Sequence, residues 1–126
     1  MGQQKSSINV IVLARQHPCE NVSSFLCEEL LNNLNSRVLN SGLKDIKWHV
    51  IPLVNLDGVE LLNTRSNLLG YDINRCWAAH LFRYSAETAW ISRYLRKIGL
   101  KSEDVVLDLH GHSREFDCFA YSTFKT

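Results

Sequence analysis

The sequence predicts an α/β fold in which a mixed β-sheet is flanked by helices. Four short apolar runs have the length and β-branched composition of strands, and two longer segments between them repeat apolar residues every three or four positions. Strands that alternate with helices in this way are typical of layered α/β domains. A chain of 126 residues is long enough for one such domain.

The first strand is predicted over residues 8–14, a mostly apolar run. Pro18 disfavours a helical conformation at His17, so the strand should end in a turn. A helix then begins near Asn21 and ends before Gly42, which is suited to a left-handed cap. Its apolar stripe has the spacing of one helix face and consists of Val22, Phe25, Leu26, Leu30, Leu34 and Val38.

The second strand is predicted over residues 46–54, where Pro52 indicates an edge strand or a bulge. Residues 55–58 have the composition of a turn, and residues 60–70 that of a polar, irregular loop.

A second helix is predicted over residues 85–98, with Ser85 as its cap and Gly99 at its end. One face of this helix carries Trp90, Tyr94, Leu95 and Ile98. Two further strands are predicted over residues 105–109 and 118–121. We interpret the tryptophans as core residues, and His49 and His80 as structural.

Composition excludes several classes of function. The chain has 14 basic and 13 acidic residues, a balance that predicts neither nucleic-acid nor anionic-membrane binding. Residues 1–7 form a polar tail without the apolar run of a signal peptide, and no segment approaches the ~18 apolar residues of a membrane span. The four cysteines show no pairing pattern, so we expect reduced thiols in an intracellular protein.

Three side chains form a candidate metal site. His17 and Glu20 are three residues apart, and His110 follows the strand predicted over residues 105–109. Two imidazoles and a carboxylate are a ligand set of catalytic zinc, and open α/β sheets bind ligands at the carboxyl ends of their strands. The alternative is that these are hydrogen-bonded structural residues, because the His-x-x-Glu spacing is common by chance.

Five blocks, taken in order, resemble the zinc metallocarboxypeptidases (carboxypeptidase A-like peptidases). The resemblance is specifically to the cytosolic carboxypeptidase branch, which trims glutamate from protein tails. The blocks are ARQHPCE (14–20), NLDG (55–58), Arg65 with the Leu-Gly pair at 69–70, DINRCW (72–77) and DLHGHS (108–113). The resemblance implies that residues 8–126 form a partial catalytic domain, with the first half of the zinc carboxypeptidase fold.

The resemblance also implies roles for individual residues. It implies one Zn²⁺ per chain, held by His17, Glu20 and His110. Asn74 and Arg75 would hold the substrate's terminal carboxylate, which guanidinium recognises in a planar, bidentate way. Arg65 would polarise the scissile carbonyl and stabilise the oxyanion.

Each of these assignments has a structural alternative. Arg75 could instead form an ion pair with Asp72, and Arg65 could be an exposed loop arginine. Asp108 could orient a ligand or be solvated. His112 is left out of the ligand set, because the first histidine of this motif binds the metal in the family.

The sequence departs from the family pattern at Cys19, Leu56 and Cys76, where the family usually has glycine, proline and a polar residue. The family's catalytic glutamate and substrate-covering tyrosine lie beyond the matching part, so we expect hydrolysis by this chain to be impaired. The implied partners are peptide or protein C-terminal tails, including tubulin. The resemblance and the lack of targeting signals together predict a cytoplasmic location, with a microtubule or cilium association. No oligomeric state is indicated.

Three other functions stay open. The chain could be a catalytically silent module that binds zinc and peptide C-termini. It could be a related zinc acylase, a class that shares the His-x-x-Glu motif, the late histidine and the Asn-Arg pair. It could also be an incomplete gene product whose open sheet edge exposes apolar surface.

Overall fold

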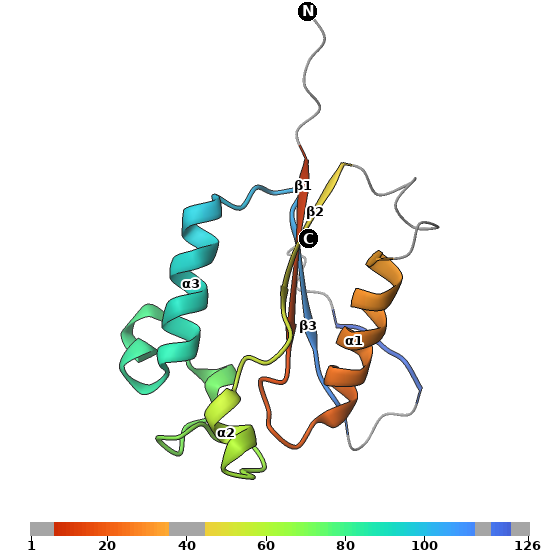
Figure 1. The fold of residues 1–126 in the computed structure, drawn as a ribbon. Helices are drawn as coiled ribbons and strands as arrows, with labels where there is room; N and C mark the ends of the chain where they lie inside the picture. Colours follow the sequence, from red (N-terminus) through yellow and green to blue (C-terminus); the bar gives the residue numbers. More distant parts are fainter. Residues whose placement is uncertain (1–6, 36–44, 113–116, 122–126) are drawn as a thin grey trace, which may run out of the picture.

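The structure, a computed structural model, describes residues 7–35, 45–112 and 117–121. Its centre is a three-stranded sheet formed by β1 (Ile8–Ala14), β2 (Ile46–Ile51) and β3 (Val105–Leu109). Two helices, α1 (Asn21–Asn35) and α3 (Ala86–Ile98), lie on opposite sides of this sheet (Figure 1). The α/β class with a helix-flanked sheet is therefore confirmed. Both strand pairs described are parallel.

Strand β1 is the middle strand, in the order β2-β1-β3. It is buried from Val10 to Ala14, because β2 and β3 cover its edges and helices cover its faces. The core cluster on one face consists of Ile11, Leu13, Val54, Ile73 and Ile91. Helix α3 completes this cluster, so it holds the sheet from the side opposite α1.

The predicted ends of α3 are confirmed. The Ser85 hydroxyl accepts a hydrogen bond from the Thr88 N–H at 3.2 Å, which satisfies a free amide of the first turn. Gly99 ends the helix with φ +65°, a left-handed conformation that glycine adopts without steric cost.

The segment between β2 and α3 contains short helices. Residues 55–58, predicted as a turn, begin helix α2 (Leu56–Glu60), because the Asn55 side chain accepts the Gly58 N–H at 3.0 Å and caps a helical turn. Two 3₁₀ helices follow, η1 (Ile73–Arg75) and η2 (Ala79–Tyr84). Residues 61–70 form an irregular loop, as expected.

Helix α1 is present, but its predicted buried stripe is partly wrong. Three stripe residues are 46%, 68% and 50% exposed: Val22, Phe25 and Leu26. The buried residues are Ser23 and Cys27. Ser23 turns inward because its hydroxyl accepts the Arg15 N–H at 3.1 Å, which rotates the helix by about one position relative to the stripe. The predicted helix end, at residues 38–42, lies outside the described residues.

Two further predictions are corrected. Residues 118–121 are not a strand, because they form no ladder with any of the described strands, although one edge of β3 is left unpaired by those strands. Trp90 is not a core residue, because it is 61% exposed and stacks on the Tyr94 ring at 5.8 Å. Of the helices described, none is both long and apolar enough to cross a bilayer.

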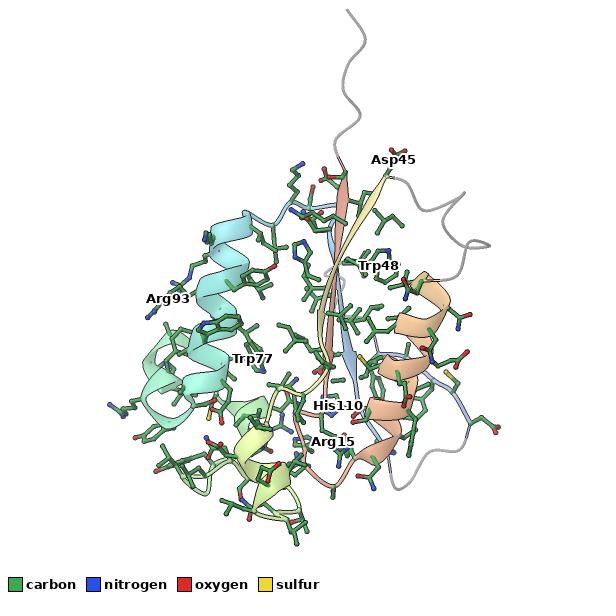
Figure 2. All side chains as sticks on the ribbon, in the orientation of Figure 1. Arg15, Asp45, Trp48, Trp77, Arg93 and His110 are labelled. Carbon is green, nitrogen blue, oxygen red and sulfur yellow. The ribbon has the colours of Figure 1, made fainter. Side chains whose placement is uncertain are left out.

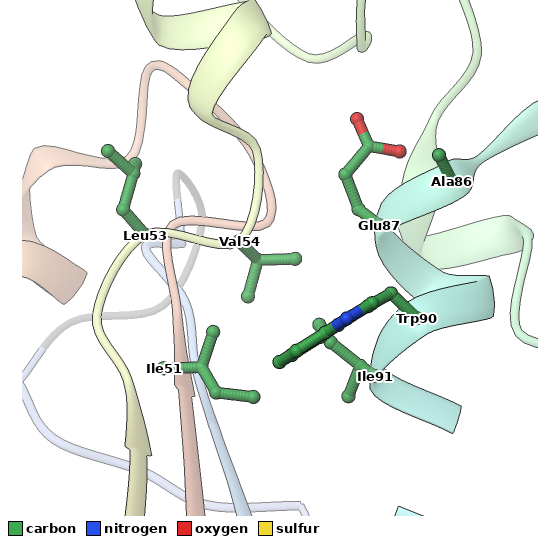
Figure 3. A pocket seen from close by; sticks show the side chains of 7 residues that line it. All are labelled: Ile51, Leu53, Val54, Ala86, Glu87, Trp90 and Ile91. Atoms are coloured by element: carbon green, nitrogen blue, oxygen red, sulfur yellow. The ribbon is translucent and has the colours of Figure 1, made fainter. Parts of the chain in front are cut away.

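Trp90 also forms one wall of an apolar pocket between α3 and the segment after β2 (Figure 3). The pocket is lined by Ile51, Leu53, Val54, Ala86, Glu87, Trp90 and Ile91. None of these residues belongs to the predicted site.

Candidate metal centre

The turn after β1 is held by Arg15, which has a left-handed φ of +61°. Its guanidinium donates to the Pro18 carbonyl and to the Ser24 hydroxyl, both at 2.8 Å. These bonds tie the turn to the first residues of α1. His17, inside this turn, is therefore buried and held in place, with only 4% of its surface exposed.

The three predicted ligands lie together. Nδ1 of His17 is 2.8 Å from Oε1 of Glu20, and Nδ1 of His110 is 2.9 Å from Oε2 of the same carboxylate. The two imidazole rings are 4.9 Å apart between centroids, and the ligand atoms of all three residues lie within 4.8 Å of one another. Two ring nitrogens and a carboxylate that converge in this way fit a zinc ion with a position left for water or substrate.

The strand order explains this convergence. His17 follows β1 and His110 follows β3, and these neighbouring strands are parallel. The chain leaves β1 through α1 on one face and reaches β3 through α3 on the other, so the strand order reverses at β1. Open α/β sheets bind ligands at such a switch point, beyond the carboxyl ends of the strands. Figure 2 shows Arg15 and His110 at this end of the sheet.

Each histidine has a second carboxylate on its other nitrogen. Oδ1 of Asp72 lies 3.1 Å from Nε2 of His17, and Oδ2 of Asp108 lies 2.8 Å from Nε2 of His110. A carboxylate on Nε2 keeps the proton there and leaves Nδ1 available to a metal. Asp108 therefore contacts a candidate ligand, as expected for a carboxylate that orients that ligand rather than one that is solvated.

The role of Asp72 was missed in the sequence, although this residue begins the DINRCW block. Its carboxylate accepts hydrogen bonds from His17, from Nε of Arg65 at 2.7 Å and from the Asn74 N–H at 2.9 Å. The ion pair considered for Arg75 is thus formed by Arg65 instead. One carboxylate joins the metal centre to two residues of the predicted substrate site.

Electrostatics in this site favour an ionised Glu20. Burial raises its pKa, but hydrogen bonds from the Gly111 N–H, His17 and His110 outweigh burial and lower it. Burial likewise raises the pKa of Asp72, and hydrogen bonds from His17 and Arg65 lower it overall. The hydrogen bond to Asp108 raises the pKa of His110, against burial. The site attracts positive charge, whether proton or metal.

The predicted substrate residues lie beside this centre to different degrees. Nδ2 of Asn74 is 3.4 Å from Nε2 of His110. Arg65 is half exposed and paired with Asp72. The exposed guanidinium of Arg75 donates to the Asn74 carbonyl at 3.3 Å, with its other donors available to a ligand.

The remaining histidines lie outside the three-residue set. His112 is exposed and its ring packs edge-on against Phe119 at 5.2 Å. His49 is buried in the sheet, bonded to Tyr94 and Asn9, and His80 is exposed.

Known proteins resemble this chain in sequence. The sequence profile of the zinc carboxypeptidase family matches residues 2–114. The chain is 35% identical over 125 residues to cytosolic carboxypeptidase 2 of Danio rerio and 33% identical over 128 residues to cytosolic carboxypeptidase 6 of Caenorhabditis elegans. It covers 17% and 27% of the length of these relatives, which in turn match 96% and 94% of the chain.

Two solved structures share the fold. The metallo-carboxypeptidase of Burkholderia cenocepacia superposes with a TM-score of 0.76 at 27% identity, over 89% of this chain and 31% of that one. The metallo-carboxypeptidase of Pseudomonas aeruginosa, solved in complex with (2-guanidinoethylmercapto)succinic acid, superposes with a TM-score of 0.75 at 27% identity, over 88% and 30%.

Proposed function

The chain belongs to the zinc carboxypeptidase family, and on this basis we propose that it supplies the zinc centre and carboxylate-binding residues for hydrolysis of C-terminal peptide bonds. The observation that carries the proposal is the convergence of His17 and His110 on the Glu20 carboxylate. These three residues would hold one Zn²⁺, which when bound supplies Lewis-acid chemistry and an activated water.

The other site residues act on the substrate. Arg75, exposed beside Asn74, would bind the terminal carboxylate of a peptide in a bidentate manner. Arg65 would stabilise the oxyanion that forms on the scissile carbonyl. The Asp72 carboxylate accepts a hydrogen bond from Nε of Arg65 at 2.7 Å and also contacts His17. It therefore fixes the position of Arg65 relative to His17.

The proposed substrates are acidic protein tails from which glutamate is removed, with tubulin as the proposed protein. The names of the relatives, which are cytosolic carboxypeptidases, support a carboxypeptidase, and the proposal of glutamate and tubulin follows from the resemblance of the motifs to that branch. The same names support a place in the cytoplasm, and a microtubule or cilium association would follow from a tubulin substrate.

One observation favours a binding module over a complete enzyme. Each of the carboxylates described at the centre is engaged by a histidine: Glu20, Asp72 and Asp108. None of the three is left to act as general base, a role that typically contributes ~100- to 10,000-fold to the rate. We therefore expect the isolated chain to bind zinc and acidic tails and to cleave them slowly.

The first experiment measures the zinc content of the purified chain. We expect about one zinc per chain in the wild type and in His80→Ala, and little zinc in His17→Ala. His80 is a matched control, because it is exposed and lies outside the site. A folded wild-type chain without zinc would refute the metal centre.

The second experiment tests the substrate class. Peptides ending in glutamate are compared with the same peptides amidated at the C-terminus, and with N-acyl amino acids. Binding of the free-acid peptides that weakens in Arg75→Ala supports the proposal, since guanidinium recognises the carboxylate. Preferential hydrolysis of N-acyl amino acids would identify an acylase instead.

A further inference from the structure

We infer that Gln16 is a positioning residue: with Trp77 and Asp108, it forms a relay that fixes which nitrogen of His110 faces the metal. This inference rests on the proposed metal centre, and it concerns residues to which the family resemblance gives no role of this kind. Gln16 is 1% exposed, so its amide is buried and its hydrogen bonds are all the more consequential.

The first step is the orientation of the Gln16 amide. Nε1 of Trp77 lies 3.0 Å from Oε1 of Gln16, and an indole N–H can only donate. The amide oxygen must therefore face Trp77, which directs the amide nitrogen to the opposite side. If the amide were flipped, its NH₂ group would face the Trp77 N–H and its oxygen would face the Asp108 carboxylate. Neither contact would then be a hydrogen bond. The Asn55 side chain also donates to the Gln16 carbonyl at 3.1 Å and holds its backbone.

The second step is the Asp108 carboxylate. The Gln16 amide nitrogen lies 2.6 Å from Oδ2 of Asp108, and the same oxygen is 2.8 Å from Nε2 of His110. Asp108 belongs to β3, whose side chains at this end are partly exposed, so the bond from Gln16 anchors a carboxylate that could otherwise turn to solvent.

The third step is the proton on His110. A carboxylate only accepts, so a contact of 2.8 Å requires that Nε2 carries a hydrogen. The amide of Asn74 is a weaker competitor for Nε2, at 3.4 Å. Nδ1 lies 2.9 Å from the Glu20 carboxylate and by the same argument donates to it, so a metal would take the place of the hydrogen on Nδ1 while Asp108 holds the one on Nε2.

The test combines zinc affinity with histidine NMR on the full chain. Gln16→Leu should weaken zinc binding by about 10-fold, the low end of the effect of removing a direct partner of a metal ligand, because Gln16 acts on His110 through Asp108. Trp77→Phe keeps an aromatic ring but removes the N–H together with part of the indole, and we expect a smaller loss. Trp48→Phe is the control, since the Nε1 of Trp48 is buried without a hydrogen-bond partner among the described residues. Its zinc affinity should be unchanged.

A double-variant cycle separates positioning from packing. If Gln16 acts through Asp108, adding Gln16→Leu to Asp108→Ala should cause no further loss of zinc affinity. If Gln16 only fills space, the two losses should multiply, and the relay is refuted. Should Gln16→Leu fail to fold, Trp77→Phe carries the same cycle with Asp108→Ala.

The Nε2–H signal of His110 provides a readout that does not need zinc. In the wild type, the bond to Asp108 should protect this hydrogen from exchange with solvent, and Gln16→Leu should speed its exchange. An unchanged exchange rate in the variant would overturn the inference even if the wild type binds zinc. A wild type without zinc but with this faster exchange in Gln16→Leu would refute the metal centre and retain the relay.

Discussion

His49 shows how a titratable residue in a strand becomes a link between elements. Its Nε2 faces Oδ1 of Asn9 at 3.1 Å and its Nδ1 faces the Tyr94 hydroxyl at 2.6 Å. The Asn9 amide nitrogen donates to Asp104 at 2.9 Å, so its oxygen faces His49 and accepts from Nε2. Tyr94 then donates to Nδ1, and the network suits a neutral ring that joins β1, β2 and α3.

This burial predicts a pH dependence of stability. Burial lowers the pKa of His49, Lys47 lowers it further, and Asp104 offsets part of the shift. Below about pH 6.5, the ordinary value for histidine, the unfolded chain takes up a proton that the folded chain resists. The His49 contribution is thus present above that pH and is lost as the pH falls through it.

Urea unfolding of the metal-free chain at several pH values measures this effect. The free energy of unfolding should fall more steeply with decreasing pH in the wild type than in His49→Gln, which keeps a donor and an acceptor. His80→Gln, an exposed change, should behave as the wild type. The raised pKa of His110 acts in the opposite direction but is common to all three proteins. Parallel curves for the wild type and His49→Gln would contradict the prediction.

At the scale of elements, helix α2 supports the turn that carries His17. Gly58 lies so close to this turn that an added Cβ would be 2.6 Å from Cγ of Pro18 and 2.6 Å from the Ser66 backbone oxygen. Close approach, rather than an unusual φ, requires glycine here. Close packing therefore explains why the last residue of the NLDG block is glycine.

Gly58→Ala should lower the free energy of unfolding by about 1–3 kcal/mol, because the Ser66 backbone cannot yield easily. It should also weaken zinc binding by displacing the Pro18 turn. Gly70→Ala is the comparison, since Gly70 has φ +83° and open space around it. That change should cost about 1–2 kcal/mol through its left-handed backbone and leave zinc affinity unchanged. Equal zinc affinities in both variants would contradict the prediction, because they would show that the packing of α2 does not affect the metal centre.

At the scale of the whole molecule, apolar surface gathers on β3 and α1. Val105, Val106 and Leu107 are 43%, 48% and 40% exposed, and Phe25 on α1 is 68% exposed. Strand β3 pairs on one side only among the strands described. An exposed apolar edge strand is a template for pairing with another chain.

The isolated chain should therefore self-associate with increasing concentration, and Val106→Lys should reduce this association because a charged edge residue opposes pairing. Leu62→Lys is the control, a change at an 89% exposed apolar residue in the loop after α2. Sedimentation over a range of concentrations measures the effect. A monomeric wild type, or equal suppression by both variants, would contradict it.

The sequence alone determined the features that depend on near neighbours. The strand positions follow from apolar, β-branched runs, and the ends of α3 follow from Ser85 and Gly99. The resemblance of the motifs also led to the zinc carboxypeptidase family, and it selected the three residues that converge in the structure.

Only the tertiary structure decided which side chains meet. The exposed face of α1, the position of Trp90 and the absence of a strand at 118–121 depend on what packs against each element. Glu20 and His110 are 90 residues apart, and the parallel register of β1 and β3 brings them together. Likewise, the bonds from Gln16 to Trp77 and Asp108 span 61 and 92 residues. Such contacts arise from chain topology, which local sequence preferences do not encode.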